Sequence, residues 1–176
     1  QFRSWEMPFN ADSNFWSYLD ARGPFKTAGQ YRRYIARMRD LPRYFGEHIV
    51  NMRAGLARGF SVPRPTLEGR DASITAFAVT DAAKNPFYAA FDKMPSTIPA
   101  AEQEQLRTEA RDAIARGVVP AYTNLLTFFR GEYLPRARTT LAAEVMPDGK
   151  AFYQAQIRHY TTLYLTPEQI HQMGLK

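Results

Sequence analysis

The apolar residues between Pro99 and Leu134 recur at steps of three or four, which is the spacing of one face of an α-helix. Pro99 stands where proline is tolerated at a helix start, and Pro135 disfavours a helical conformation in the residue before it. At about 1.5 Å per residue, such a helix spans roughly 50 Å. The residues of the apolar face are Leu106, Ala110, Ile114, Val118, Tyr122, Leu125, Phe129 and Tyr133.

The two halves of this helix differ in side-chain character. The first half carries charges on its outer side, whereas apolar side chains point in several directions between Ala121 and Phe129. A helix that is apolar on most sides is usually buried on most sides. Pro120 lies between the halves, and we expect it to kink the helix because it removes one backbone hydrogen bond. We also expect the second half to need packing partners beyond this chain.

Two shorter helices are predicted between Thr27 and Gly59. Thr27 and Gln30 have the spacing of a capping box, so a helix begins there. Pro42 is expected to end it and to start a second, antiparallel helix that ends at Gly59. The inward residues keep helical spacing on both sides of Pro42. They are Tyr31, Tyr34, Ile35, Met38, Leu41, Phe45, Ile49, Met52 and Leu56.

Further helices are expected at residues 66–80 and 151–164, and Thr166 caps the start of a last one. The inward candidates of the helix at 151–164 are Phe152, Tyr153, Ile157 and Tyr160. Residues 1–26 are rich in aromatic side chains and predict an extended lead-in that packs on the helices, with a short hairpin as an alternative. The sequence therefore predicts an all-α fold: antiparallel helices in an irregular array around one long, Pro-kinked helix.

Composition narrows the class of protein without naming an activity. The chain has 176 residues, of which 45% are hydrophobic, so it forms globular structure. It contains no cysteine, which excludes disulfides, cysteine-ligated metals and a cysteine nucleophile. No apolar run is long enough to span a membrane. We interpret residues 1–176 as a single helical region. The last helix has a well-capped start but only a few residues after it. We therefore expect residues 1–176 to be the front portion of a larger domain.

The net charge of +6 raises the question of nucleic-acid binding. The densest basic patch lies on one predicted helix and the residue that follows it; Arg32, Arg39 and Arg43 fall near one stripe, and Arg33 and Arg37 lie beside it. Such a stripe could contact phosphates, but we prefer to interpret it as a solvated helix face. No nucleic-acid-binding motif accompanies it, so we expect no nucleic-acid partner.

The three histidines give no metal-binding motif. His48 follows Glu47 but lacks the second histidine that a His-Glu-x-x-His helix requires, and Tyr44 occupies the place that the inverted motif would need. His159 and His171 are separated by Pro167 and have no spacing that favours a shared ion. We therefore assign no catalytic, cofactor-binding or metal-binding residue in this chain.

Several ordered motifs make the chain similar to the bacterial domain-of-unknown-function 885 family. The match covers nearly the whole chain, and it departs at Tyr164, where an acidic residue is expected. The similar segments are Met7-Pro8-Phe9-Asn10, Leu41-Pro42-Arg43-Tyr44, Arg58-Gly59 with Pro63-Arg64, Pro86-Phe87-Tyr88, Glu132-Tyr133-Leu134-Pro135, Asp148-Gly149-Lys150-Ala151-Phe152-Tyr153, Arg158-His159-Tyr160-Thr161-Thr162 and Leu165-Thr166-Pro167-Glu168-Gln169-Ile170-His171-Gln172-Met173-Gly174-Leu175.

The resemblance implies a mainly helical protein related to zinc peptidases, exported in many members, whose His-Glu-x-x-His-like helix lies further along the chain. In such a parent, zinc and the motif glutamate would activate water for peptide hydrolysis. This chain would supply scaffold and a cleft wall, with no catalytic residue or zinc of its own, and would be inactive alone. Its partner would be the downstream remainder of the domain. A non-catalytic helical interaction module is the alternative function, and a cytoplasmic location is the alternative to the periplasm.

Overall fold

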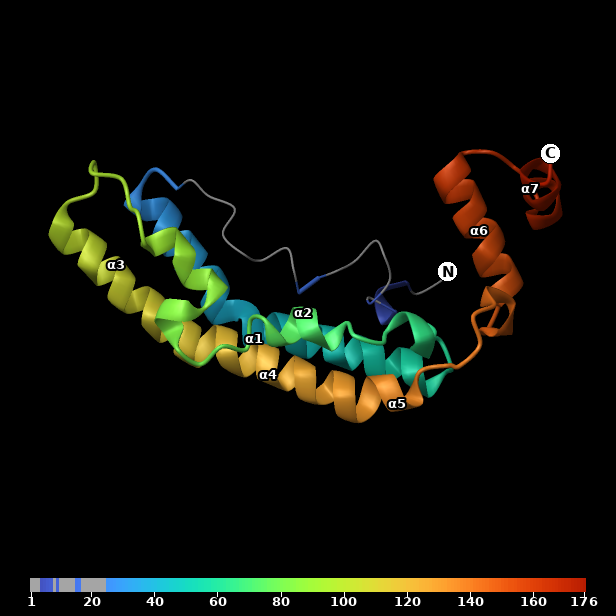
Figure 1. Ribbon diagram of the computed structural model, residues 1–176, viewed down its shortest axis with the longest axis horizontal. Coiled ribbons are helices and arrows are strands. Elements are labelled where there is room, and N and C mark those ends of the chain that lie inside the picture. Colours follow the sequence, from blue (N-terminus) through green and yellow to red (C-terminus); the bar gives the residue numbers. More distant parts are fainter. Residues whose placement is uncertain (1–3, 8, 10–14, 17–24) are drawn as a thin grey trace.

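The computed structural model describes residues 4–7, 9, 15–16 and 25–176, and within these residues every regular element is a helix. The all-α prediction is confirmed. Figure 1 shows two long helical rods lying side by side, with α6 and α7 standing away from one end of them. The hairpin considered for residues 1–26 lies largely outside the described residues.

The first rod is one helix, α1 (Ala28–Ala57), and both of its ends follow from the sequence. Thr27 and Gln30 form the predicted capping box. At the other end, Gly59 has a positive φ of 73°. The Phe60 N–H donates to Gly55 O and the Gly59 N–H to Leu56 O, which is the Schellman arrangement that a glycine at this position permits.

The predicted break at Pro42 is wrong, because α1 continues through it. Proline in a helix costs stability because it lacks an N–H and crowds the preceding turn. Here the buried face runs unbroken from Tyr31 to Leu56. Packing of that whole face outweighs the local preference, so one helix replaces the expected antiparallel pair.

The second rod is a continuous helix from Ala100 to Arg136 that contains two π-helical segments. It consists of α3 (Ala100–Ala113), η5 (Ile114–Val118), α4 (Val119–Phe128), η6 (Phe129–Tyr133) and α5 (Leu134–Arg136).

Each π segment in this rod ends two residues before a proline, Pro120 or Pro135. A π turn bonds residues five apart and so changes which carbonyl faces the proline ring. At Pro120, where a kink was predicted, the helix contains a π segment. The helix was predicted to end before Pro135, but it continues through a second π segment.

The two rods run in the same direction. Arg32 lies 2.6 Å from Glu102 near their starts, and Arg53 lies 2.5 Å from Glu132 near their ends. The chain returns between them through η2 (Arg64–Thr66), α2 (Asp71–Thr75), η3 (Ala82–Lys84) and η4 (Pro86–Phe91). This return is visible in green in Figure 1. The principal helix pair is thus parallel, which requires a long connection where an antiparallel pair needs a short loop.

The rods approach each other closely at Gly117, in η5. A Cβ atom at this position would lie 2.5 Å from Met38 O, so one α-hydrogen of Gly117 points at that oxygen. Pro42 has no N–H to donate to the Met38 carbonyl, its i−4 partner in α1. The Met38 carbonyl therefore lacks its helical N–H donor and faces Gly117 instead. Only glycine is small enough to come this close, and it does so in a Cα–H···O contact.

The second half of the rod is buried by this chain itself, so the expectation that it needs outside partners is wrong. The ring of Phe9 lies 5.0 Å from those of both Phe129 and Tyr133. The Tyr122 hydroxyl donates to Trp16 O, and the Trp16 indole donates to Ser73 Oγ at 3.1 Å. The N-terminal aromatic residues that the structure describes thus cover this half, as their predicted packing role requires.

The predicted helix at 66–80 is much shorter than expected. Only α2 is α-helical there, because Gly69 just before it has a positive φ of 77°. Leu67 and Ile74 are fully buried, as predicted. At the C-terminal end the remaining elements are η7 (Ala143–Val145), α6 (Gly149–Thr161) and α7 (Pro167–Gly174), and at the N-terminal end η1 (Ser4–Glu6).

We predict that Gly117→Ala destabilises the fold by about 1–3 kcal/mol, because the added methyl meets backbone atoms that cannot rotate away. Urea unfolding followed by circular dichroism measures this change. Gly131→Ala is the matched control: it lies in the other π segment, and a Cβ there meets nothing within 4 Å. It should be neutral or stabilising by up to about 1 kcal/mol. Equal losses for the two variants would contradict the close-approach argument.

Candidate functional site

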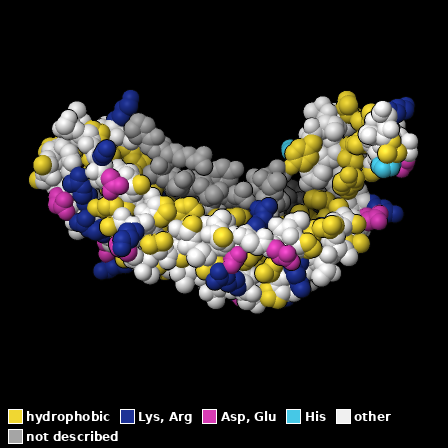
Figure 2. Space-filling model, in the orientation of Figure 1, with side chains coloured by type: hydrophobic (Ala, Val, Ile, Leu, Met, Phe, Trp, Pro, Cys, Tyr) yellow, Lys and Arg dark blue, Asp and Glu magenta, His cyan; other side chains and the backbone are white. Residues whose placement is uncertain are grey.

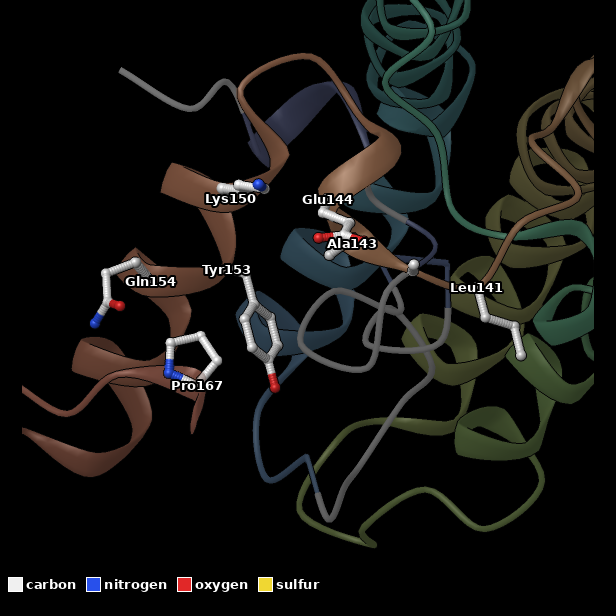
Figure 3. A pocket seen from close by; sticks show the side chains of 8 residues that line it. Leu141, Ala143, Glu144, Lys150, Tyr153, Gln154 and Pro167 are labelled. Carbon is white, nitrogen blue, oxygen red and sulfur yellow. The ribbon is translucent and has the colours of Figure 1, made fainter. Parts of the chain in front are cut away.

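A hollow of about 730 Å³ lies where the chain leaves the rods. One wall is the segment that contains η7, a second is α6, and the third is the start of α7. Its lining residues are Leu141, Ala142, Ala143, Glu144, Lys150, Tyr153, Gln154 and Pro167. Figure 3 shows Tyr153 projecting from α6 between Pro167 and the segment that carries Ala143. Most of the lining is apolar.

Arg138 holds the first wall of the hollow against the rods. Its guanidinium donates to Ser61 O at 2.9 Å, to Thr140 O at 2.5 Å and to Ala142 O at 2.9 Å. Its backbone N–H donates to Ser61 Oγ at 3.0 Å. Partial burial lowers the pKa of Arg138 below its ordinary value. One side chain therefore satisfies three carbonyl groups and fixes the path of the chain into η7.

The turn into α6 requires a glycine. Asp148 has a left-handed backbone with φ of 54°, and Gly149 follows it. A Cβ at Gly149 would lie 2.0 Å from Ala143 O, so only glycine lets α6 pass this close to η7. The ring of Phe152 then packs edge-on against Phe60 at 5.5 Å, which joins α6 to the end of the first rod.

The connection from α6 to α7 forms the third wall. The Gln154 amide donates to Leu165 O at 2.6 Å, and Thr166 forms the predicted capping box with Gln169. The guanidinium of Arg158 lies 4.3 Å from the centre of the Tyr164 ring, a cation–π contact. The family resemblance predicted an acidic residue at position 164. In this chain the aromatic ring of Tyr164 contacts Arg158 instead.

The polar side chains that line the hollow are one acid, one base, one phenol and one amide. Glu144 and Lys150 face the hollow from opposite walls and form no ion pair with any described residue. A single carboxylate with no histidine beside it does not make a metal site. The arrangement suits an apolar group with a polar edge, such as a protein side chain or a helix face.

Exposed apolar side chains gather on the same part of the molecule. Eight of the ten large exposed hydrophobic side chains in the described residues lie between positions 141 and 175, although this segment is a fifth of the chain. Figure 2 shows hydrophobic side chains at the surface of the part that carries α6 and α7. We call this the α6–α7 apolar surface; its members are Leu141, Val145, Tyr153, Tyr160, Leu163, Tyr164, Met173 and Leu175. Monomeric proteins rarely leave so much apolar area in one place.

Two sequence predictions for α6 fail here. Tyr153 and Tyr160 were expected to face inward, but 46% and 62% of their surfaces are exposed. Phe152 and Ile157 are buried as expected. Periodicity identified an amphipathic helix but could not show that Tyr153 and Tyr160 are exposed on it.

The three histidines lie apart from one another. Within the described residues, none of them belongs to a group of side chains that could bind a metal ion. His48 lies on α1 with its ring stacked on Phe15 at 4.1 Å and edge-on to Tyr44 at 4.6 Å. His159 and His171 are exposed on α6 and α7. In the part of the chain that the structure describes, no group of three His, Cys, Asp or Glu side chains is placed to hold a metal ion. These residues do not fit the zinc ion that the family resemblance implies.

The predicted arginine stripe is largely neutralised. Arg32 pairs with Glu102 at 2.6 Å, Arg43 pairs with Asp40 and Glu47, and Arg39 lies 4.0 Å from Asp112. These carboxylates face the three arginines of the stripe, whereas Arg33 and Arg37 beside it have no ion pair within the described residues. None of the helices in the described residues combines the length and the apolarity of a membrane span.

The sequence of all 176 residues matches the profile of DUF885, described as bacterial protein of unknown function. The chain belongs to this family. No curated protein matches the DUF885 chain at a significant level. The family assignment thus confirms the resemblance drawn from the motifs, and it leaves the peptidase relationship as an expectation.

The fold of this DUF885 chain is similar to a crystal structure described as "the putative lipoprotein from Colwellia psychrerythraea". The TM-score is 0.80 at 24% sequence identity, and the match covers 89% of this chain. At this identity the likeness concerns the fold alone. The match covers 27% of the solved protein, so the DUF885 chain spans about a quarter of that protein's length.

We predict that Arg138→Ala loosens the first wall of the hollow and lowers stability by about 1–3 kcal/mol, because it leaves partly buried carbonyl groups without donors. Hydrogen exchange measured by mass spectrometry should show faster exchange in residues 139–146. Arg138→Lys should give an intermediate result, since lysine keeps the charge but lacks the guanidinium fork. Arg136→Ala, at an exposed neighbour, is the control. Unchanged exchange in Arg138→Ala would contradict the assigned role.

A second prediction concerns pH and His48. Burial lowers the pKa of His48 below its usual 6.5, and its buried Nδ1 atom has no hydrogen-bond partner among the described residues. Below pH 6.5 the unfolded chain therefore takes up a proton that the folded chain resists, so stability falls as pH decreases. Urea unfolding between pH 8 and pH 5 should show a smaller decrease for His48→Phe than for the wild type. The exposed His159→Gln is the control; parallel pH profiles for all three proteins would refute this role.

Proposed function

We propose that this chain is the front, non-catalytic scaffold of a larger exported bacterial protein, a metal-dependent hydrolase that resembles peptidases. The observation that carries the scaffold role is the α6–α7 apolar surface. Its large apolar side chains are exposed, and it adjoins the 730 Å³ hollow. We propose that the remainder of the same polypeptide packs on this surface and that the hollow accepts one of its side chains.

The family and the fold comparison support this proposal. The chain corresponds to 27% of a solved protein with a similar fold, so a protein of that length has ample further chain to cover the surface. The printed description of that protein as a lipoprotein favours export, with a cytoplasmic location as the alternative. The hydrolase activity, its zinc and its peptide-like substrate rest on the family resemblance, and the parent's metal ligands would come from outside this chain.

The scaffold role has a physical basis in the rods. Two parallel helices are joined by ion pairs, aromatic contacts and a close backbone approach at Gly117. Such a pair provides a stiff support from which Phe152 and the Arg138 hydrogen bonds project α6 in a defined direction. Rigid elements of this kind hold the walls of a catalytic cleft better than loops do.

The α6–α7 apolar surface also favours a second function, that of a helical interaction module without catalysis. In that case the surface binds a separate protein. The two functions differ in what a longer polypeptide containing this sequence would do. A hydrolase would bind zinc and cleave peptides, whereas an interaction module would do neither.

We predict that replacing Leu163 and Met173 by Ser destabilises the longer polypeptide by roughly 3–6 kcal/mol, because each buried apolar side chain contributes about 1.5–3 kcal/mol. The same double variant of the 176-residue chain should change little, since both side chains are exposed there. Val50→Ser, on the exposed face of α1, is the control in both backgrounds. Thermal unfolding gives the comparison. Equally small effects in both backgrounds would contradict intramolecular packing.

Zinc content and hydrolysis of a peptide library by the longer polypeptide test the catalytic part. We expect about one zinc ion per molecule and metal-dependent cleavage. A zinc-free, inactive polypeptide in which Leu163 and Met173 are buried would leave the scaffold role standing and refute the hydrolase.

A further inference from the structure

A second hollow lies at the start of α1, far along the rods from the α6–α7 apolar surface. Its volume is about 310 Å³, and its lining residues are Phe25, Gln30, Arg33, Tyr34 and Arg37. Two arginines one helical turn apart thus share a hollow with two aromatic rings and one amide. This volume is at the lower end of the range for small-molecule sites.

Arg33 and Arg37 differ from the neighbouring arginines of α1 in having no anionic partner. Arg32, Arg39 and Arg43 all face carboxylates within 4.0 Å. Neither Arg33 nor Arg37 forms an ion pair or a hydrogen bond with any described residue. Side chains four residues apart lie on the same face of a helix, so both guanidinium groups can reach one anion.

The other lining groups are held in place. The ring of Phe25 lies 5.3 Å from Tyr34 and 5.2 Å from Tyr31, so the aromatic wall is part of a packed cluster. Oε1 of Gln30 accepts from the backbone N–H groups of Lys26 at 2.6 Å and Thr27 at 3.2 Å. These two bonds fix the amide and leave its Nε2 group available as a donor.

We propose that this hollow binds a small organic anion, a carboxylate or phosphate attached to a flat apolar group. Guanidinium groups bind the oxygens of such anions in paired hydrogen bonds. The half-buried ring of Phe25 provides an apolar wall for the flat group, with the buried ring of Tyr34 tilted behind it, and Gln30 supplies a further donor. The site is independent of the proposed hydrolase, because it shares no residue with the α6–α7 apolar surface or its hollow.

The test uses phenyl phosphate, benzoate and inorganic phosphate as probes, with binding followed by NMR titration of the 176-residue chain. Phenyl phosphate and benzoate should bind and shift resonances of residues 25–37. Phenyl phosphate should bind more tightly than inorganic phosphate, because only the former contacts the rings. Arg33→Gln and Arg37→Gln should each weaken binding of the phenyl probes about tenfold, and both variants should keep the wild-type melting temperature, since the side chains are exposed.

Arg32→Gln and Arg39→Gln are the matched controls and should change binding little. An equally large loss in these controls would overturn the proposal, because the whole basic surface would then attract the anion. If inorganic phosphate bound as tightly as phenyl phosphate, the rings would not contribute to binding, and the proposed preference for an anion with a flat apolar group would be wrong. No binding of any probe at millimolar concentration would overturn the proposal altogether.

Discussion

The contact between Gly117 and the Met38 carbonyl sets the distance between the two rods, and the rest of the fold depends on that distance. Pro42 removes the donor that Met38 O would have within α1, and the missing side chain of Gly117 lets the second rod approach the same oxygen. This separation allows the ion pairs Arg32–Glu102 and Arg53–Glu132 to form between the rods. It also allows the buried aromatic residues to pack there. A residue that breaks helices in most settings thus takes part in joining two of them.

The parallel direction of the rods has a consequence for the outer parts of the molecule. Because both rods end on the same side, the chain leaves α5 beside the end of α1, where Arg138 and Phe152 attach the next segment to Ser61 and Phe60. The hollow and the α6–α7 apolar surface therefore lie at one end of a stiff support. The hollow lined by Arg33 and Arg37 lies near the other end, at the start of α1.

Helix boundaries with local causes could be read from the sequence. The capping boxes at Thr27 and Thr166 and the left-handed glycine at Gly59 depend on residues within one turn, so short-range chemistry decides them. The apolar periodicity of the second rod was also correct, because it reflects the burial of a single face. The errors came where distant packing outweighed local preference: Pro42 does not break α1, and Pro120 and Pro135 are accommodated by π segments.

The sequence by itself determined the all-α class, the family and the ends of its best-capped helices, because each rests on local pattern or ordered motifs. Only the tertiary structure decided that the long helices are parallel, that the second rod is covered from within the chain, and that the exposed apolar surface lies around α6 and α7. It also showed which arginines of α1 already have carboxylate partners. These features depend on contacts between residues about seventy positions apart, and neither periodicity nor residue spacing encodes such contacts.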